Sequence, residues 1–206
     1  MNILEIKKLT VGVLKDFNLA VKTGGRAILR GENGAGKTTL VNAIMGNPDY
    51  EIKSGKIIFN GADITNLKTD VRARLGIFFG AQHVPEIAGL SVMTFIKHSY
   101  IAHNGDVPMG EFMKKLKDAA AKLSVPDAWL SRSVNVGFSG GERKKLMFLH
   151  LLVLQPKLAI LDEPDSGADK TARKLFGKII DSMKDTTFLV ISHQQVEFAV
   201  DTEINI

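Results

Sequence analysis

The sequence predicts an α/β fold with a mostly parallel core sheet, a small antiparallel β-subdomain and an inserted helical subdomain. Three observations predict it. Strand-like apolar runs alternate with helical patterns after residue 140, which is typical of a parallel sheet covered by helices. Short strand-like segments dominate the first sixty residues, and residues 92–130 show helical periodicity without a strand signal.

The first half holds the antiparallel part and the beginning of the core. Alternating polarity predicts short strands, and Asn60-Gly61 predicts the turn after one of them. A buried strand, a glycine-rich loop and a helix also follow one another here, and a later strand ends at Gly80-Ala81-Gln82. The expected strands are 3–11, 17–21, 27–30, 56–59 and 75–79, and the expected helix runs from 37 to about 45.

The second half predicts the helical subdomain and the rest of the core. The expected helices are 92–100, 109–123, 127–130, 142–154, 168–184 and 194–200, and the expected strands are 157–161 and 187–191. We therefore expect a single domain over 1–206. Residues 1–87 and 139–206 would form the core with its β-subdomain, and residues 88–138 would form the helical subdomain.

Composition excludes several classes of function. The chain has no cysteine, so it supplies no disulfide, thiolate nucleophile or thiolate metal ligand. Its net charge of +5 comes from basic residues spread along the chain without aromatic interleaving, so we expect no nucleic-acid partner. We interpret the basic residues, including clusters such as Arg72/Arg74 and Arg143-Lys144-Lys145, mainly as solvated helix faces together with phosphate-handling positions. No signal peptide and no apolar run near ~18 residues is present, which predicts a cytoplasmic protein without direct membrane insertion.

Residues Gly31 to Thr38 fit the phosphate-binding P-loop pattern G-x-x-x-x-G-K-[ST]. Its glycines let backbone N–H groups surround the β- and γ-phosphates of a nucleotide, and the helix that follows adds positive potential. Lys37 would neutralise phosphate charge and the Thr38 hydroxyl would bind Mg²⁺. The alternative is a plain glycine-rich turn. The expected cofactor-binding residues here are Gly31, Glu32, Asn33, Gly34, Ala35, Gly36, Lys37, Thr38 and Thr39.

Two carboxylates follow the apolar run 157–161. A P-loop fold needs an acid at the end of such a strand to hold the metal through water, and Asp162 is that candidate. Glu163 would lie nearer the γ-phosphate, where it can act as general base toward water. The alternative is that both are solvated carboxylates after a strand.

Gln82 and His193 each lie just past a predicted strand, at the sheet edge where α/β proteins bind ligands. A glutamine amide can bind Mg²⁺ or orient water, and a histidine can donate to a γ-phosphate oxygen. Either residue alone is more often an ordinary surface residue. Together with the P-loop and the acid pair they become candidate catalytic residues, with Gln82 also a candidate metal ligand beside Thr38 and Asp162.

Two consecutive glycines open the helix expected at 142–154. Each glycine costs a helix about 1 kcal/mol relative to alanine, so helix propensity does not favour Gly140-Gly141. A bare backbone at a helix N-terminus does allow close approach to an anion.

These motifs, in this order, resemble the ATP-binding-cassette (ABC) ATPases. The resemblance covers nearly the whole chain and implies a P-loop ABC-type ATPase that uses ATP and Mg²⁺. In such ATPases the signature motif of one subunit faces the γ-phosphate in the P-loop of the other, which implies ATP-dependent homodimerisation. The helical subdomain then ends at the signature motif. The additional cofactor-binding residues it implies are Ser139, Gly140, Gly141, Glu142 and Asp169.

A narrower resemblance is to the SufC branch, the ATPases of the SUF iron–sulfur cluster assembly system. It is carried by the segments 47–52, 76–79, 84–87, 132–142 and 161–167. The implied function is to drive conformational change in a SufB-like scaffold protein, with or without a SufD-like one. The chain departs from its family between Val11 and Leu14, where no aromatic residue is present to stack on adenine.

Two other functions remain open. A membrane ABC transporter uses a nucleotide-binding subunit with the same catalytic core, and its permease docks near the residue corresponding to Gln82. A regulator acting on nucleic acid or ribosomes is the third class, but such proteins often carry two cassettes in tandem and this chain contains one.

Overall fold

A central parallel sheet organises the structure, a computed structural model that describes residues 1–82 and 84–206. Within these ranges the sheet has the strand order β11-β3-β10-β9-β6, and every neighbouring pair is parallel. Its strands are β3 (Arg26–Arg30), β6 (Ile77–Gly80), β9 (Leu158–Asp162), β10 (Thr187–Ile191) and β11 (Thr202–Asn205).

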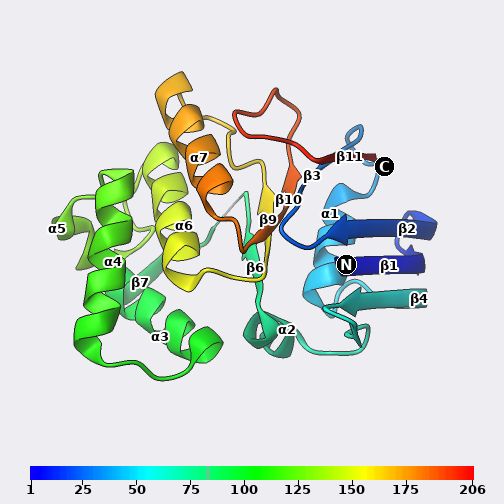
Figure 1. The fold of residues 1–206 in the computed structure, drawn as a ribbon, viewed down its shortest axis with the longest axis horizontal. Helices are drawn as coiled ribbons and strands as arrows, with labels where there is room; N and C mark the ends of the chain where they lie inside the picture. Colours follow the sequence, from blue (N-terminus) through cyan, green and yellow to red (C-terminus); the bar gives the residue numbers. More distant parts are fainter. Residues whose placement is uncertain (83) are drawn as a thin grey trace.

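The central strands β9 and β10 are buried at successive positions, so both faces of the sheet are covered there, as is usual for parallel sheets. Ala159 and Leu161 of β9 pack on one side with α6 (Gly140–Leu154) and α7 (Lys170–Ser182). Leu158 and Ile160 pack on the other side with α1 (Lys37–Met45). Figure 1 shows the resulting layers, with α6 and α7 on one side of the sheet and α1 on the other.

An antiparallel sheet covers the outer side of α1 (Figure 1). Its strand order is β2-β1-β4-β5. The strands are β1 (Asn2–Val11), β2 (Leu14–Lys22), β4 (Ile52–Phe59) and β5 (Ala62–Asp63).

The helical region lies at the opposite end of the molecule (Figure 1). It contains α3 (Val92–Asn104), α4 (Met109–Leu123) and α5 (Asp127–Leu130), and the short strands β7 (Ile87–Ser91) and β8 (Ser133–Val134) pair at its base. The predicted fold class is therefore confirmed. The division of the domain at 88–138 stays a prediction.

Several local features differ from the expectation. Helix α2 (Thr69–Leu75) and the short strands β5, β7 and β8 were not expected, and residues 194–200, expected as a helix, are irregular. That segment lies directly against α7: a Cβ on Gly177 would be 1.9 Å from the Glu197 carbonyl oxygen. Close packing on a neighbouring helix thus replaces the local helical preference. In the described part of the chain no helix has the length and apolar character needed to cross a bilayer.

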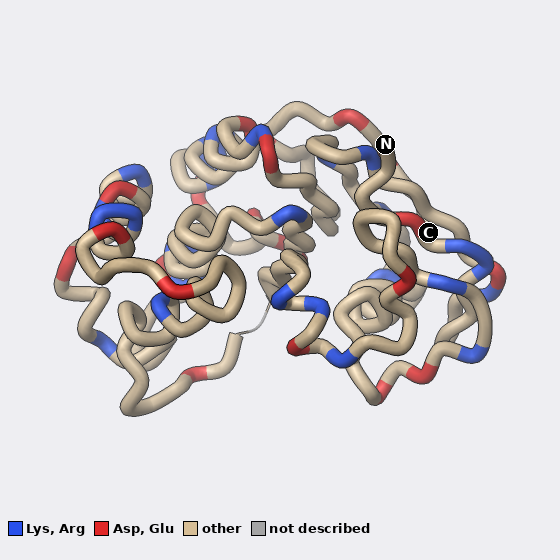
Figure 2. The backbone as a smooth tube through the Cα atoms, turned by 60° about the horizontal axis from the view of Figure 1, so that its bottom comes forward, with Lys and Arg blue, Asp and Glu red and all other residues tan. Residues whose placement is uncertain are grey.

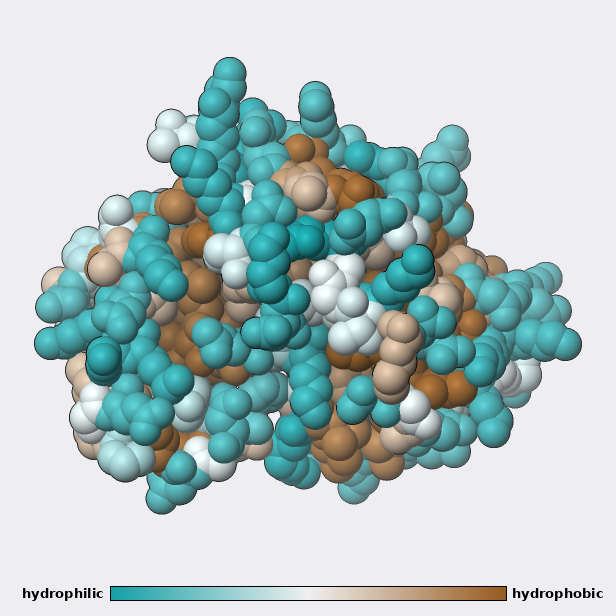
Figure 3. Space-filling model, in the orientation of Figure 1, coloured by the Kyte–Doolittle hydropathy of each residue, from teal (hydrophilic) through white to brown (hydrophobic). Residues whose placement is uncertain are grey.

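The charges are mixed over the whole molecule. Figure 2 shows basic and acidic positions interspersed on both lobes rather than gathered on one face. Hydrophilic side chains cover most of the face in Figure 3, with hydrophobic atoms exposed in patches between them. This distribution agrees with the interpretation that most basic residues lie on the solvated surface. Arg72 and Lys144, described below, are exceptions.

Candidate active site

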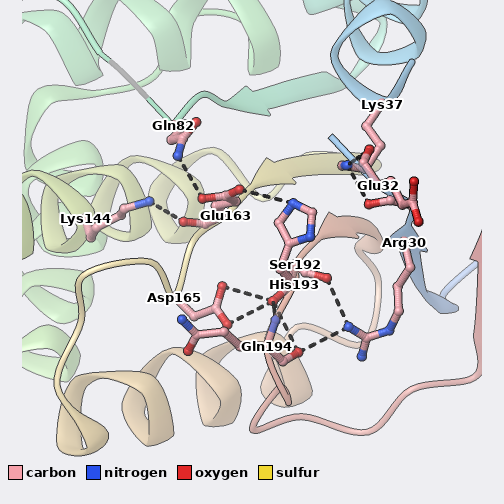
Figure 4. Close-up of polar contacts among 11 residues, drawn as sticks. Arg30, Glu32, Lys37, Gln82, Lys144, Glu163, Asp165, Ser192, His193 and Gln194 are labelled. Carbon is pink, nitrogen blue, oxygen red and sulfur yellow. Dashed lines mark hydrogen bonds and ion pairs between the residues drawn. The ribbon is translucent and has the colours of Figure 1, made fainter. Parts of the chain in front are cut away.

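The predicted site residues follow the carboxyl ends of four neighbouring strands. The P-loop follows β3, His193 follows β10, Asp162 ends β9 with Glu163 directly after it, and Gln82 follows β6. Because these strands are adjacent in the parallel sheet, their ends meet at one edge, where open α/β sheets bind ligands. Figure 4 shows Gln82, Glu163, His193 and Lys37 at this edge.

The P-loop has the backbone geometry that its glycines allow. Gly34 and Gly36 have φ values of 87° and 109°, in the left-handed region that favours glycine. A Cβ on Gly36 would also lie 2.6 Å from Leu14 Cδ2, so only glycine fits between the loop and β2. Lys37 is buried, and its Nζ donates to the carbonyl oxygens of Gly31 and Glu32 at 2.8 Å each.

A hollow of about 290 Å³, here called the P-loop hollow, brings together most of the predicted residues. Gly31, Glu32 and Ala35 belong to the same loop without lining it. Val13, in the turn between Val11 and Leu14 that has no aromatic residue, also lines the P-loop hollow and is 63% exposed. The predicted residues that line the hollow are Asn33, Gly34, Gly36, Lys37, Thr38, Thr39, Gln82, Asp162, Glu163 and His193.

Glu163 lies between the two other candidate catalytic side chains. Gln82 Nε2 donates to its Oε2 at 2.7 Å, and His193 Nε2 lies 3.5 Å from its Oε1. Glu163 has φ 47°, an uncommon value for a residue with a side chain. A backbone turn immediately after β9 therefore directs this carboxylate toward Gln82 and His193.

The charges around the acid pair are coupled. Burial raises the pKa of Asp162 and the adjacent Glu163 raises it further, while the cationic side chains of Lys144 and Lys37 act in the opposite direction. Burial lowers the pKa of Lys144, and the nearby carboxylates oppose this. A cation beside Asp162 would favour its ionised form.

The signature residues lie outside the P-loop hollow. Ser139 caps α6, and Glu142 accepts a hydrogen bond from Ser139 N at 2.7 Å, completing a capping box. These backbone and side-chain hydrogen bonds lower the pKa of Glu142. Asp169 caps α7 by accepting from Ala172 N at 2.8 Å. Gly140 lines a second hollow of about 380 Å³, which shares Gln82 with the first.

Sequence reasoning missed several residues at this edge. Lys144, interpreted as part of a solvated helix face, is partly buried and its Nζ donates to the Glu163 carbonyl oxygen. Ser192, Asp165 and Arg30 form polar contacts around His193 (Figure 4). Proximity in sequence to Glu163 and His193 was the available signal for Asp165 and Ser192, and adjacency to the P-loop was the signal for Arg30, whereas Lys144 had none. The roles assigned to the predicted residues stay predictions.

Comparison with known proteins places the chain in a family. The model of the ABC transporter family matches residues 14–166, well over half of the chain. A probable ABC transporter ATP-binding protein of Streptococcus pyogenes serotype M18 is 42% identical over 205 residues, covering 95% of this chain and 80% of the relative. A probable ATP-dependent transporter of Synechocystis is 39% identical over 205 residues, with coverages of 94% and 80%.

Solved structures agree on the fold. The ATP-binding subunit of an ABC transporter superposes with a TM-score of 0.81 at 25% identity, covering 93% of this chain and 79% of that one. A dimeric ATP-binding cassette with ADP and Pi bound has a TM-score of 0.79 at 19% identity, with coverages of 93% and 88%. The family match and the strand-end arrangement of the P-loop and acid pair lead to one conclusion: the chain belongs to the ABC transporter family and is an ATP-binding cassette that hydrolyses ATP.

Proposed function

We propose that this ATPase drives conformational change in a SufB-like scaffold protein, with or without a SufD-like protein, during iron–sulfur cluster assembly. The catalytic half of the proposal depends on Glu163, held between Gln82 and His193 beside the P-loop. The assembly half is supported by the resemblance of segments such as 132–142 and 161–167 to the SufC branch.

In the proposed mechanism, the N–H groups of the P-loop and the Lys37 ammonium bind the β- and γ-phosphates of ATP. Glu163 accepts a proton from the attacking water. His193 donates to a γ-phosphate oxygen, and Gln82 orients the water from the other side of Glu163. The three side chains line the P-loop hollow together with Lys37, which supports in-line attack of water on a γ-phosphate bound there.

The hollow also suits Mg²⁺. Thr38, Gln82 and Asp162 line it, and their side chains carry hydroxyl, amide and carboxylate oxygens, the kind of ligand that Mg²⁺ prefers. Gln82 uses its Nε2 for Glu163, which leaves Oε1 for a cation. Among the described residues no cluster of three or more His, Asp or Glu forms a cage, so phosphate and water oxygens would complete the coordination. When bound, Mg²⁺ would neutralise charge on the phosphates.

We also propose that two copies complete each other's sites. Ser139, Gly140, Gly141 and Glu142 lie outside the P-loop hollow, yet they form a helix N-terminus suited to an anion. A Cβ on either glycine would meet nothing within 4 Å, so another chain can approach this surface closely. In a head-to-tail dimer this terminus would face the γ-phosphate bound by the partner copy.

Replacing the general base tests the catalytic half. Glu163→Gln should slow ATP hydrolysis at least ~100-fold, the scale of a lost general base, because an amide cannot accept the proton. Binding of ATP should persist, because the P-loop is unchanged. Hydrolysis is measured as phosphate release and binding with a fluorescent ATP analogue. A variant that hydrolyses ATP at the wild-type rate would show that Glu163 is not the base.

A second candidate is the nucleotide-binding subunit of a membrane transporter. The relatives named as ABC transporter ATP-binding proteins, at 42% identity, favour it. Affinity purification of the tagged chain from its native cell, with mass spectrometry of the captured proteins, separates the two candidates. We expect a SufB-like protein without membrane spans. Recovery of a polytopic membrane protein instead would favour the transporter.

A further inference from the structure

His193 is placed by its neighbours in the chain more than by its own contacts. Its side chain is 43% exposed, and its contact with Glu163 spans 3.5 Å. The regular pairing of β10 with β9 ends at Ile191 and Asp162, just before both residues. The backbone of residues 192–194 therefore decides where the imidazole lies relative to the Glu163 carboxylate.

Ser192 is the buried residue of the segment 192–194, with an exposed fraction of 2%. Its Oγ donates to the Asp165 carboxylate, 3.0 Å from Oδ2 and 3.3 Å from Oδ1, and accepts a hydrogen bond from Gln194 N at 3.1 Å. Asp165 lies two residues beyond Glu163 (Figure 4). One hydroxyl group thus joins the residues on both sides of His193 to the segment that carries Glu163.

Two arginines hold the same loop from other directions. Arg30 Nη1, at the end of β3, donates to the carbonyl oxygens of Ser192 at 3.0 Å and Gln194 at 3.3 Å. Arg173 Nη1, on α7, donates to Gln194 Oε1 at 3.0 Å. These contacts fix the loop against β3 and α7. The link toward Glu163 comes from Ser192 and Asp165, beyond the backbone hydrogen bond from Glu163 N to Ile191 O at 2.9 Å.

We propose that Ser192 and Asp165 are positioning residues for ATP hydrolysis, whose hydrogen bond holds His193 at its working distance from Glu163. The inference rests on the roles proposed above for Glu163 and His193. Displacing a reacting group by about 1 Å can lower a rate on the order of 100-fold, so a partly loosened loop should affect turnover. ATP affinity should change little, because neither positioning residue lines the P-loop hollow.

Serine variants are the cleanest test, because Asp165 also interacts electrostatically with Lys144. In Ser192→Ala we expect kcat to fall ~10-fold while KM for ATP stays within about twofold. Ser192→Thr keeps the hydroxyl and should recover kcat to within about threefold of wild type. The matched control is Thr186→Val, at the other end of β10. Thr186 is equally buried and its hydroxyl donates to Pro156 O at 2.8 Å, so its loss should leave kcat unchanged.

A double-mutant cycle separates positioning from general stabilisation. If Ser192 acts through His193, Ser192→Ala should have no further effect in a His193→Ala background, as measured by single-turnover hydrolysis. An equal ~10-fold loss in both backgrounds would overturn the inference, as would an effect on KM alone. If Ser192→Ala does not fold, Asp165→Ala in the same two backgrounds provides the same comparison.

Different results would contradict the proposed role of His193 and the positioning role of Ser192. A His193→Ala variant that hydrolyses ATP like wild type would remove the proposed role of His193 and this inference with it. A slow His193→Ala variant beside a normal Ser192→Ala variant would leave the proposed function intact and overturn the positioning role alone.

Discussion

At the scale of single residues, a histidine beside the helical half of the core lies in an apolar environment. His150, on α6, lies against the rings of Phe78 and Phe95, with centroid distances of 5.2 and 5.0 Å. Its Nε2 is buried without a hydrogen-bond partner among the described residues. Burial, and to a smaller degree the nearby His103, lowers the pKa of His150 from 6.5 to about 4. The ring is therefore neutral at physiological pH.

This pKa predicts acid sensitivity with a defined sign. The unfolded chain binds the proton near pH 6.5 and the folded chain only near pH 4, so stability falls as pH drops through this window. Lowering the pH from 7 to 5 should reduce the free energy of unfolding by about 2 kcal/mol through His150. Urea unfolding at both pH values should show a pH-dependent loss of stability about 2 kcal/mol smaller in His150→Met than in wild type. His98→Met, at an exposed site, should behave like wild type. Equal pH dependence in all three proteins would contradict the assignment.

At the scale of elements, helix α1 is constrained at both ends. Gly36 begins it in a conformation and a space that only glycine fits, and Arg72 of α2 holds its other end. Arg72 is 1% exposed, and its guanidinium donates to four backbone carbonyls. Sequence reasoning treated Arg72 as a solvated charge, which was wrong, because nothing in a short charged segment reveals a buried helix end. The acceptors are the carbonyl oxygens of Ala43, Ile44, Thr65 and Leu67.

Arg72 should therefore matter for stability. Arg72→Met leaves buried carbonyl groups without donors and should lower the free energy of unfolding by about 3 to 5 kcal/mol in urea. Arg72→Lys should recover only part of this, because an ammonium cannot present the planar fork. The control is Arg74→Met on the same helix, where an exposed ion pair with Asp70 is lost and the change should stay below about 1 kcal/mol. Similar losses for both methionine variants would refute this account of Arg72.

At the scale of the whole molecule, the residues predicted to bind ATP lie on two separate surfaces. The P-loop hollow gathers the phosphate-binding and acidic residues at one sheet edge, whereas the signature residues open a different helix outside it. In the proposed dimer each copy supplies the half that the other lacks. Hydrolysis would then reopen the dimer, since the γ-phosphate joins the two halves.

Light scattering should detect this cycle. Glu163→Gln with ATP and Mg²⁺ should run at twice the monomer mass, because ATP persists at the interface. Wild type under the same conditions, and the variant with ADP, should remain monomeric. A monomeric Glu163→Gln variant at saturating ATP would contradict the shared-site arrangement.

Much of the fold was predictable, because its signals are local or periodic. Apolar runs such as 157–161 and 187–191 predicted core strands, and the glycine-rich loop before Lys37 predicted the strand–loop–helix unit. Residues 194–200 were mispredicted because their conformation depends on packing against α7. Helix α2 was missed for a related reason, since Arg72 bonds to the end of α1 as well as to the residues just before α2, and the contact with α1 spans 28 to 29 residues of sequence.

The sequence by itself determined which strand ends carry the P-loop, the acid pair, Gln82 and His193, because each motif directly follows a predicted strand and the carboxyl ends of parallel strands meet at one edge of the sheet. Only the tertiary structure decided which side chains touch there. Ser192 and Asp165 are separated by 27 residues, and Lys144 and Glu163 by 19. Such contacts arise when distant segments pack together, and no local pattern of polarity or turn residues encodes them.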